Sequence, residues 1–468
     1  MGMSVSKVPK KWDGEADVIV VGGGNSGLPA AITAYDKGAS VIVLEVSGGM
    51  ASSLAMIAGG TPFTGTDLQK AEGIKDSPDQ LYKEAVKVSG GDPKLWRALA
   101  DRQEEVYEWL KSIGAKPERV LLAPGHLLRR SIKFEGHGPA LCKVLREAAA
   151  SKKIDIRYHH RAEKLIQDPD SGRVIGITAK HEGKTKNFRA KKAVILTTGG
   201  FSQNLAIVKE FGPHFADLVS TAPKTHQGDG LKMAMAIGAG TDGLGLAVCP
   251  SMPVGAETLQ FVNAGLGGGI TVDKDGKRFG NEATEELGTY TEKHKICLDH
   301  DPTGLHISIA DQAIRDLNPP PGKTKEPIYK ANTIEDLAKQ LGIDPKALKK
   351  TVDEYNSDIE KYGYDRKYGR RLLGMAWPEK PVMKLDTPPY YAVKNKICLT
   401  SMKGGLRINA KCQIVDQYGD VIPGLYAAGE IAGGLERIPH HYYTGRMTVQ
   451  AFTQGRIAGD VAADEVGA

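Results

Sequence analysis

The sequence predicts an α/β fold, in which a doubly wound parallel sheet is interrupted by an inserted α+β cap domain. Short apolar runs end in glycine-rich turns near both ends of the chain, at residues 18–27, 193–200 and 424–430, and helical patterns follow the first and the last of these turns. From about residue 245, proline and glycine become frequent and the segments become shorter, which indicates the insert. We therefore expect residues 1–244 and 389–468 to form one domain and residues 245–388 to form the cap.

The first turn has the pattern of a dinucleotide-binding, Rossmann-like βαβ unit. The apolar run at 18–21 leads into Gly-Gly-Gly-Asn-Ser-Gly at 22–27, and a second apolar run at 41–44 ends in Glu45. Such glycines let the backbone approach a pyrophosphate, the helix start offers free N–H groups, and the acid can bind a ribose hydroxyl group. The alternative is an ordinary α/β turn without a ligand. We predict a dinucleotide site that includes Gly22, Gly24, Asn25, Ser26, Gly27 and Glu45.

The other elements are expected in the following order. Between the first turn and the insert, we predict a helix over 139–150, a strand over 154–158, a hairpin from 168–177 and 180–189, and a buried strand over 193–196. Within the insert, Thr333 and Asp336 predict a capped helix start, and Asp344-Pro345 predicts a second start. The helix after Asp344 has one apolar face for a core: Leu348, Val352, Tyr355 and Ile359. A helix over 445–463 ends the chain.

Composition excludes several classes of function. Lys and Arg exceed Asp and Glu by 62 to 56 in 468 residues, without a basic block, so neither nucleic acid nor a membrane surface is an expected partner. The five cysteines are scattered without a CxxC pair, so no metal site is predicted. No run reaches the roughly 18 apolar residues of a membrane-spanning helix, and the N-terminus lacks a signal-peptide core. We expect a cytoplasmic protein.

Several motifs, taken jointly, resemble the fumarate reductase and 3-ketosteroid dehydrogenase superfamily of flavoproteins (FAD-binding type 2) over nearly the whole chain. They are residues 22–27, Glu45, Gly48-Gly49-Met50, Thr197-Thr198-Gly199-Gly200-Phe201, 228–234, Gly276-Lys277-Arg278-Phe279, Asn281-Glu282 and 423–430. The resemblance implies FAD across the doubly wound domain and a cap over the isoalloxazine face. It also implies that Glu45 holds the adenosine ribose, the Ala162 backbone the adenine edge, and Glu430 the ribityl or diphosphate side.

The resemblance extends the predicted FAD site to other turns. Backbone N–H groups at the start of the last helix are expected to face the flavin pyrimidine ring. The additional residues assigned to FAD are Ser52, Ser53, Gly59, Gly60, Thr198, Gly199, Gly200, Asp229, Gly429, Arg446, Met447 and Thr448. Family members with covalent FAD carry a histidine where this chain has residues 51–54, Ala-Ser-Ser-Leu, so non-covalent FAD is expected. No second GxGxxG unit follows, so a separate molecule is expected to donate or accept the electrons.

The residues with which fumarate reductases bind dicarboxylates are replaced here. By its distance from Asn281, the family's proton-donating arginine corresponds to Glu286. Its two histidines correspond to Cys249 and Ser401, and its substrate arginine corresponds to Tyr442. Because paired arginines suit planar carboxylates, their replacement argues against a dicarboxylate substrate.

The C-terminal motif is instead similar to the ketosteroid dehydrogenase branch. Tyr442-Tyr443-Thr444-Gly445 resembles the Tyr-x-Ser-Gly of enzymes that introduce the 4-ene. There a tyrosine and a hydroxyl group handle the proton α to a ketone, while flavin N5 exchanges hydride with the β carbon. Tyr442 and Thr444 are the predicted proton-transfer pair, and Tyr290 is the predicted cap tyrosine. Arg446 is a candidate anchor that could, like His440 and His441, lower the tyrosine pKa. The alternative is that Tyr442 and Tyr443 only pack the last helix.

These observations lead to one hypothesis and two rivals. The hypothesis is an FAD-dependent oxidoreductase that acts on a carbon–carbon bond next to a carbonyl group, by desaturating a ketone or reducing an enone of steroid-like or cyclic type. The first rival is a fumarate-reductase-like reductase of an unsaturated carboxylate, with Arg446 and Arg437 as a rearranged clamp. The second rival is a non-catalytic flavin electron-transfer subunit.

Overall fold

The computed structural model describes residues 8–49, 53–56, 60–123, 125–255, 266–283, 292–318, 325–374, 377–439 and 442–467. Its largest sheet has the order β21-β22-β9-β1-β2-β6, with β8 added to β9 and β7 to β8. The bounds are β1 Gly14–Val21, β2 Val41–Leu44, β6 Asp155–Arg157, β7 Arg161–Gln167, β8 Val174–His181, β9 Lys184–Leu196, β21 Gln413–Val415 and β22 Val421–Ala427.

The centre of this sheet is parallel. Strand β1 pairs in parallel with β2 on one side and with β9 on the other, and β9 pairs in parallel with β22. Parallel strands buried on both faces have continuous apolar sequences, and residues 18–21, 41–44 and 193–196 are all buried. The carboxyl ends of β1, β9 and β22 therefore lie side by side, and each ends in one of the glycine-rich turns.

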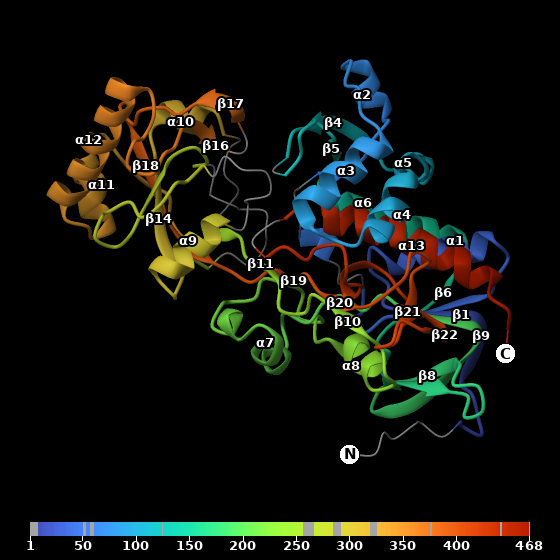
Figure 1. Cartoon of the computed structure of the whole chain (residues 1–468). Helices are drawn as coiled ribbons and strands as arrows, with labels where there is room; N and C mark the ends of the chain where they lie inside the picture. Colours follow the sequence, from blue (N-terminus) through green and yellow to red (C-terminus); the bar gives the residue numbers. More distant parts are fainter. Residues whose placement is uncertain are drawn as a thin grey trace.

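Three helices lie over this sheet (Figure 1): α1 Gly27–Asp36, α6 His137–Ser151 and α13 Arg446–Asp464. Helix α13 packs along α1, although more than 400 residues separate their starts in the chain. Gly455 and Gly459 allow this close packing, because a Cβ at Gly459 would lie 2.3 Å from the Ala30 carbonyl oxygen. The predicted last helix and the predicted helix over 139–150 are thus present in the structure.

The hairpin predicted over 168–189 is present with a different turn. Strand β8 ends at His181, and β9 runs without interruption from Lys184 to Leu196. The reversal lies at Glu182 and Gly183, which both have positive φ angles, of 50° and 76°. The predicted break between the second arm of the hairpin and the buried strand is wrong, because one long strand serves as both.

Smaller elements complete this part of the chain. Helices lie at α2 Asp67–Ala71, α3 Pro78–Ser89, α4 Pro93–Asp101, α5 Gln103–Ser112, α7 Leu205–Phe211 and α8 Asp229–Met235. Short strands lie at β3 Thr61–Pro62, β4 Pro117–Leu121, β5 Ser131–Phe134, β10 Thr241–Asp242, β11 Ala247–Val248, β19 Ser401–Met402 and β20 Gly405–Leu406. The β10–β20 and β11–β19 pairs join the two segments of the chain that flank the insert.

The insert has its own sheet and its own hydrophobic core, which lie to one side of the large sheet (Figure 1). Its strands are β12 Ser251–Pro253, β13 Ile270–Val272, β14 Leu305–Ala310, β15 Tyr329–Ala331, β16 Leu372–Gly374, β17 Trp377–Pro381 and β18 Tyr390–Ile397. Its helices are α9 Glu292–His300, α10 Gln312–Asp316, α11 Ile334–Leu341 and α12 Pro345–Tyr362. As predicted, α11 is capped by Thr333 and ends at Gly342, and α12 buries Leu348, Val352 and Tyr355.

The contacts of β18 indicate a different position for the second domain boundary, which was predicted between residues 388 and 389. Strand β18 pairs with β12, β14 and β15, and Ala392 and Val393 are buried in the core of the insert. Because β18 begins after residue 388, it lies on the far side of the predicted boundary. We propose that the boundary follows β18.

Candidate active site

The first glycine turn has the geometry of a cradle for a phosphate group. Gly22 has a φ angle of +105°, and a Cβ at Gly27 would lie only 1.8 Å from the Gly22 carbonyl oxygen, so both positions require glycine. A Cβ at Gly24 would meet no atom within 4 Å, because this residue faces open space. Ser26 makes no side-chain hydrogen bond to the start of α1. At the start of α1, the Leu28 and Ala30 N–H groups already donate to the Gly24 and Ser26 carbonyl oxygens, at 3.0 and 3.1 Å, and Pro29 has no N–H. Of the first four residues of the helix, Gly27 is thus the one that can offer its N–H to an anionic ligand.

Glu45 lies beside this turn at the end of β2. One carboxylate oxygen accepts a hydrogen bond of 2.7 Å from the Gly23 N–H, and the other accepts bonds of 2.8 and 2.7 Å from the Ser47 N–H and hydroxyl groups. The residue is 5% exposed and lines the cleft described below. The structure thus fixes the carboxylate at the edge of the turn, where the sequence predicts a ribose contact.

The second and third turns converge on the first. The Thr197 hydroxyl group donates to the Val21 and Gly22 carbonyl oxygens at 2.9 and 2.8 Å. A Cβ at Gly200 would lie 2.3 Å from Glu430, and a Cβ at Gly429 would lie 2.6 Å from Ser26. The glycines at these positions let three loops from distant parts of the chain meet at the carboxyl edge of the sheet.

A long open cleft runs across this edge, with about 1810 Å³ of empty space including its mouth. Sixteen of the predicted site residues line it: Gly22, Gly24, Asn25, Ser26, Glu45, Ser53, Gly60, Ala162, Thr198, Gly199, Asp229, Glu430, Tyr442, Thr444, Met447 and Thr448. Gly27, Gly200, Gly429 and Arg446 do not line it. Ser52, Gly59 and Tyr290, like His440 and His441, lie outside the described residues.

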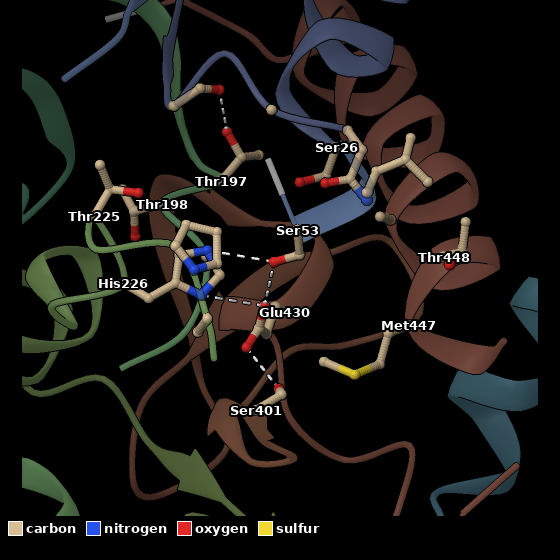
Figure 2. Close-up of a pocket in the computed structure, with 18 of the residues that line it drawn as sticks. Ser26, Ser53, Thr197, Thr198, Thr225, His226, Ser401, Glu430, Met447 and Thr448 are labelled. Carbon is tan, nitrogen blue, oxygen red and sulfur yellow. Dashed lines mark hydrogen bonds and ion pairs between the residues drawn. The ribbon is translucent and has the colours of Figure 1, made fainter. Parts of the chain in front are cut away.

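The middle of the cleft contains a polar cluster that the sequence did not reveal (Figure 2). The Ser401 hydroxyl group donates to Glu430 at 2.6 Å, His226 Nδ1 lies 3.5 Å from the other Glu430 oxygen, and Ser53 lies within 3.5 Å of both His226 and Glu430. Burial by itself raises the pKa of Glu430, but His226 and Ser401 more than offset this, so the pKa lies below its ordinary value. His226 lies two residues before the recognised motif at 228–234, and this proximity is the sequence feature from which it could have been predicted as a site residue.

Tyr442 and Thr444 lie together at the end of the cleft, just before α13 begins at Arg446. Thr444 Oγ1 is buried without a hydrogen-bond partner. The Thr444 carbonyl oxygen accepts a bond of 2.8 Å from His126 Nε2, which must therefore carry the ring proton. Burial lowers the pKa of His126 to about 3, so its ring is uncharged. The loop thus presents a phenol and an unsatisfied hydroxyl group to the cleft.

Tyr443, between them, is buried in a different environment. Its hydroxyl group donates to Glu84 at 2.9 Å and accepts from Arg130 at 2.7 Å. Arg130 in turn pairs with Asp76 at 3.1 Å. Burial, together with Glu84 and against the effect of Arg130, raises the pKa of Tyr443 well above its ordinary value. This side chain anchors the loop and does not line the cleft.

The Arg446 side chain differs from its predicted position at the substrate. It is 1% exposed, pairs with Glu436 at 2.9 Å and contacts Gln450. Arg437, the other arginine of the predicted carboxylate clamp, pairs with Asp242 at 2.6 Å. Neither arginine lines the cleft, because both are held by carboxylates behind or beside it.

The cleft fits FAD. Its glycine cradle is open at Gly24, and buried hydroxyl groups of Thr198 and Thr444 lack partners within the described protein. The chain belongs to the family described as FAD binding domain, whose model matches residues 17–441. It is an FAD-dependent oxidoreductase of the class that acts on carbon–carbon bonds.

Curated relatives cover almost all of this chain. Fumarate reductase (cytochrome) from Shewanella frigidimarina is 32% identical over 461 residues, which are 96% of this chain and 77% of that protein. Urocanate reductase from Eggerthella lenta is 30% identical over 485 residues, with coverage of 98% and 76%. These similarities confirm the predicted resemblance.

Solved structures agree with both branches of the resemblance. The open conformation of a flavocytochrome c3 fumarate reductase superposes with a TM-score of 0.81 at 29% identity, covering 97% of this chain and 79% of that one. The 3-ketosteroid-Δ4-(5α)-dehydrogenase from Rhodococcus jostii, in complex with 4-androstene-3,17-dione, superposes with a TM-score of 0.75 at 25% identity, covering 98% and 99%. In the part of the chain that the structure describes, no helix combines the length and the apolar character needed to cross a membrane.

Proposed function

We propose that this enzyme desaturates an uncharged ketone of cyclic or steroid-like type, or reduces the corresponding enone. The observation that carries the proposal is the chemistry of the cleft wall. Apart from Tyr442 and Thr444, the lining includes the histidine His226 together with hydroxyl-bearing and apolar residues from three other segments: Thr221, Ala222, Pro223, Thr225, Val248, Pro250, Thr400 and Ser401. Such a wall suits a neutral ring system with few polar atoms.

The charged side chains of the cleft belong to the turns assigned to FAD. Among the described lining residues, Arg161 is the one arginine, and it pairs with Asp229 at 2.8 Å. Cys249 and Ser401 stand where fumarate reductases are expected to carry histidines, and Cys249 does not line the cleft. Among the described lining residues, a dicarboxylate would therefore find no arginine other than Arg161, which already pairs with Asp229.

Two residues of the loop before α13, Tyr442 and Thr444, have roles in the proposed reaction. In desaturation, Tyr442 takes the proton from the carbon α to the carbonyl group, and Thr444 donates a hydrogen bond that orients the phenol or the substrate oxygen. FAD, when bound, supplies the acceptor or donor of the hydride at the β carbon. The two electrons pass to or come from a separate electron carrier. A cytoplasmic location and non-covalent attachment of FAD remain predictions.

The second candidate function is reduction of an unsaturated acid. The identity to a fumarate reductase and a urocanate reductase over most of the chain favours it. It requires a cationic clamp, and Arg446 and Arg437 are already paired with Glu436 and Asp242. We therefore rank it below the ketone.

An anaerobic screen of the FAD-loaded enzyme tests the proposal. Saturated cyclic ketones are added to oxidised enzyme, and enones or unsaturated acids are added to enzyme reduced beforehand, while the flavin absorbance is followed. The proposal expects bleaching by a ketone or reoxidation by an enone. Reoxidation by fumarate or urocanate alone would contradict it and support the second candidate.

A further inference from the structure

A buried lysine lies directly behind the proposed catalytic tyrosine. Lys403 follows β19 in the turn to β20, its side chain is 0% exposed, and its Nζ lies 6.0 Å from the centre of the Tyr442 ring. The turn is held firmly, because the Lys403 N–H donates to the Leu246 carbonyl oxygen at 2.7 Å. A Cβ at Gly404 would lie 2.1 Å from Gly243. A lysine that is fully buried needs a specific electrostatic reason.

Lys403 shares a buried carboxylate with a second cation. Glu436, whose side chain is fully buried, lies 3.7 Å from Lys403 Nζ and 2.9 Å from Arg446 Nη2. Its other oxygen accepts the Tyr443 N–H at 3.1 Å. One carboxylate is thus shared by two cations, and one of them, the Lys403 ammonium, lies close to the Tyr442 ring. Positive charge at this distance favours the anionic form of a phenol.

We propose that Lys403 is a positioning residue that stabilises the phenolate form of Tyr442 and so makes this tyrosine an effective base. The inference rests on the proposed function for its catalytic meaning, whereas the electrostatic effect on Tyr442 is testable on its own. Burial, partly offset by Glu436, lowers the pKa of Lys403 from its ordinary value.

Apart from Arg446, the other titratable groups that the structure describes near this loop do not provide the same effect. Burial raises the pKa of the Cys249 thiol to about 12, so it is uncharged, and His126 is uncharged as well. Glu84 and Arg130 act on Tyr443, whose pKa they and burial leave high. Across the cleft, His226 and Glu430 pair with each other. Two adjacent tyrosines are thus placed in opposite environments, a recognised way to separate their acid–base roles.

Titration of the FAD-loaded enzyme tests this inference. The ultraviolet absorbance of phenolate is followed against pH, and subtraction of the Tyr442→Phe titration isolates Tyr442. In Lys403→Met the midpoint is expected to rise by about one to two pH units, because a unit charge 6.0 Å from the ring centre is lost in a medium of effective dielectric constant about 20. Lys403→Arg is expected to stay near the parent, and exposed Lys411→Met is the matched control.

Lys403→Met is expected to fold, because Glu436 keeps Arg446 and the Tyr443 N–H as partners. FAD content and thermal midpoint check this. An unchanged Tyr442 midpoint in folded Lys403→Met would overturn the inference. A raised midpoint supports it even if Tyr442→Phe keeps full turnover, a result that would instead refute the proposed catalytic role. The rising limb of the pH–rate profile for flavin reduction is expected to shift in the same direction and by the same amount.

Discussion

Replacement of Tyr443 by phenylalanine is expected to destabilise the protein while leaving catalysis largely intact. The lost hydroxyl group donates to Glu84 at 2.9 Å and accepts from Arg130 at 2.7 Å, and all three side chains are buried. Arg130 and Glu84 stay 3.2 Å apart after the change, so each loses one bond of several. Two bonds to charged groups, partly compensated in this way, correspond to about 2 kcal/mol.

Trp96 provides a local probe for this measurement. Its ring centre lies 5.5 Å from that of Tyr443 in an edge-to-face arrangement, so urea unfolding can be followed by tryptophan fluorescence. We expect a lower denaturation midpoint with an unchanged slope, and flavin reduction at a rate within a few-fold of the parent. The exposed Tyr418→Phe is the control. An unchanged midpoint, or a loss of turnover as large as that of Tyr442→Phe in protein saturated with FAD, would refute the reasoning.

Three further predictions concern FAD binding and pH. Gly27→Ala should abolish FAD binding, because its Cβ would lie 1.8 Å from the Gly22 carbonyl oxygen; FAD content after purification measures this. Glu45→Ala should weaken FAD binding about ten- to a hundredfold by removing a charged acceptor, as measured by flavin fluorescence titration. Acid should destabilise the insert: Arg278 overcomes burial and lowers the pKa of Glu282 to about 2, so its stabilisation is complete above the ordinary value of 4.5 and is lost as the pH falls towards 2. Unfolding of the parent and Glu282→Gln against pH measures this.

Each of these predictions has a control. Gly24→Ala should fold normally and only weaken FAD binding, because its Cβ meets no protein atom within 4 Å. If Gly27→Ala keeps normal FAD content, the turn does not have the described geometry. If Glu45→Ala binds FAD like the parent, the carboxylate does not contact the cofactor. Equal acid sensitivity of the parent and Glu282→Gln would show that the Arg278 pair does not govern the insert.

Local sequence patterns were sufficient to predict much of the fold. The glycine turns were predictable because positive φ angles and contacts such as that between Gly27 and Gly22 leave few other residues possible. The capped start at Thr333 was predictable for the same local reason. By contrast, strand β18 gives no local signal of the sheet with which it pairs, and its place in the insert depends on contacts distant in the sequence.

Some residues of the candidate site were likewise predictable from local patterns, and others were not. Glu45 and Tyr442 belong to motifs with fixed spacing, and both line the cleft. His226 and Lys403 were missed because each acts through partners that only tertiary folding brings near, namely Glu430 for His226 and Glu436 for Lys403. Arg446 was predicted to contact the substrate because it is a charged residue close to the tyrosine motif. In the structure it is buried and pairs with Glu436 inside the protein.

The central claim is that Tyr442 transfers the α proton of a neutral ketone. Its most direct test is stopped-flow reduction of the flavin in Tyr442→Phe, saturated with FAD, by a ketone identified in the anaerobic screen. The account predicts a rate about 10²- to 10⁴-fold below the parent, as for the loss of a general base, with Tyr418→Phe unchanged. Reduction of the flavin in Tyr442→Phe at the parental rate would contradict it.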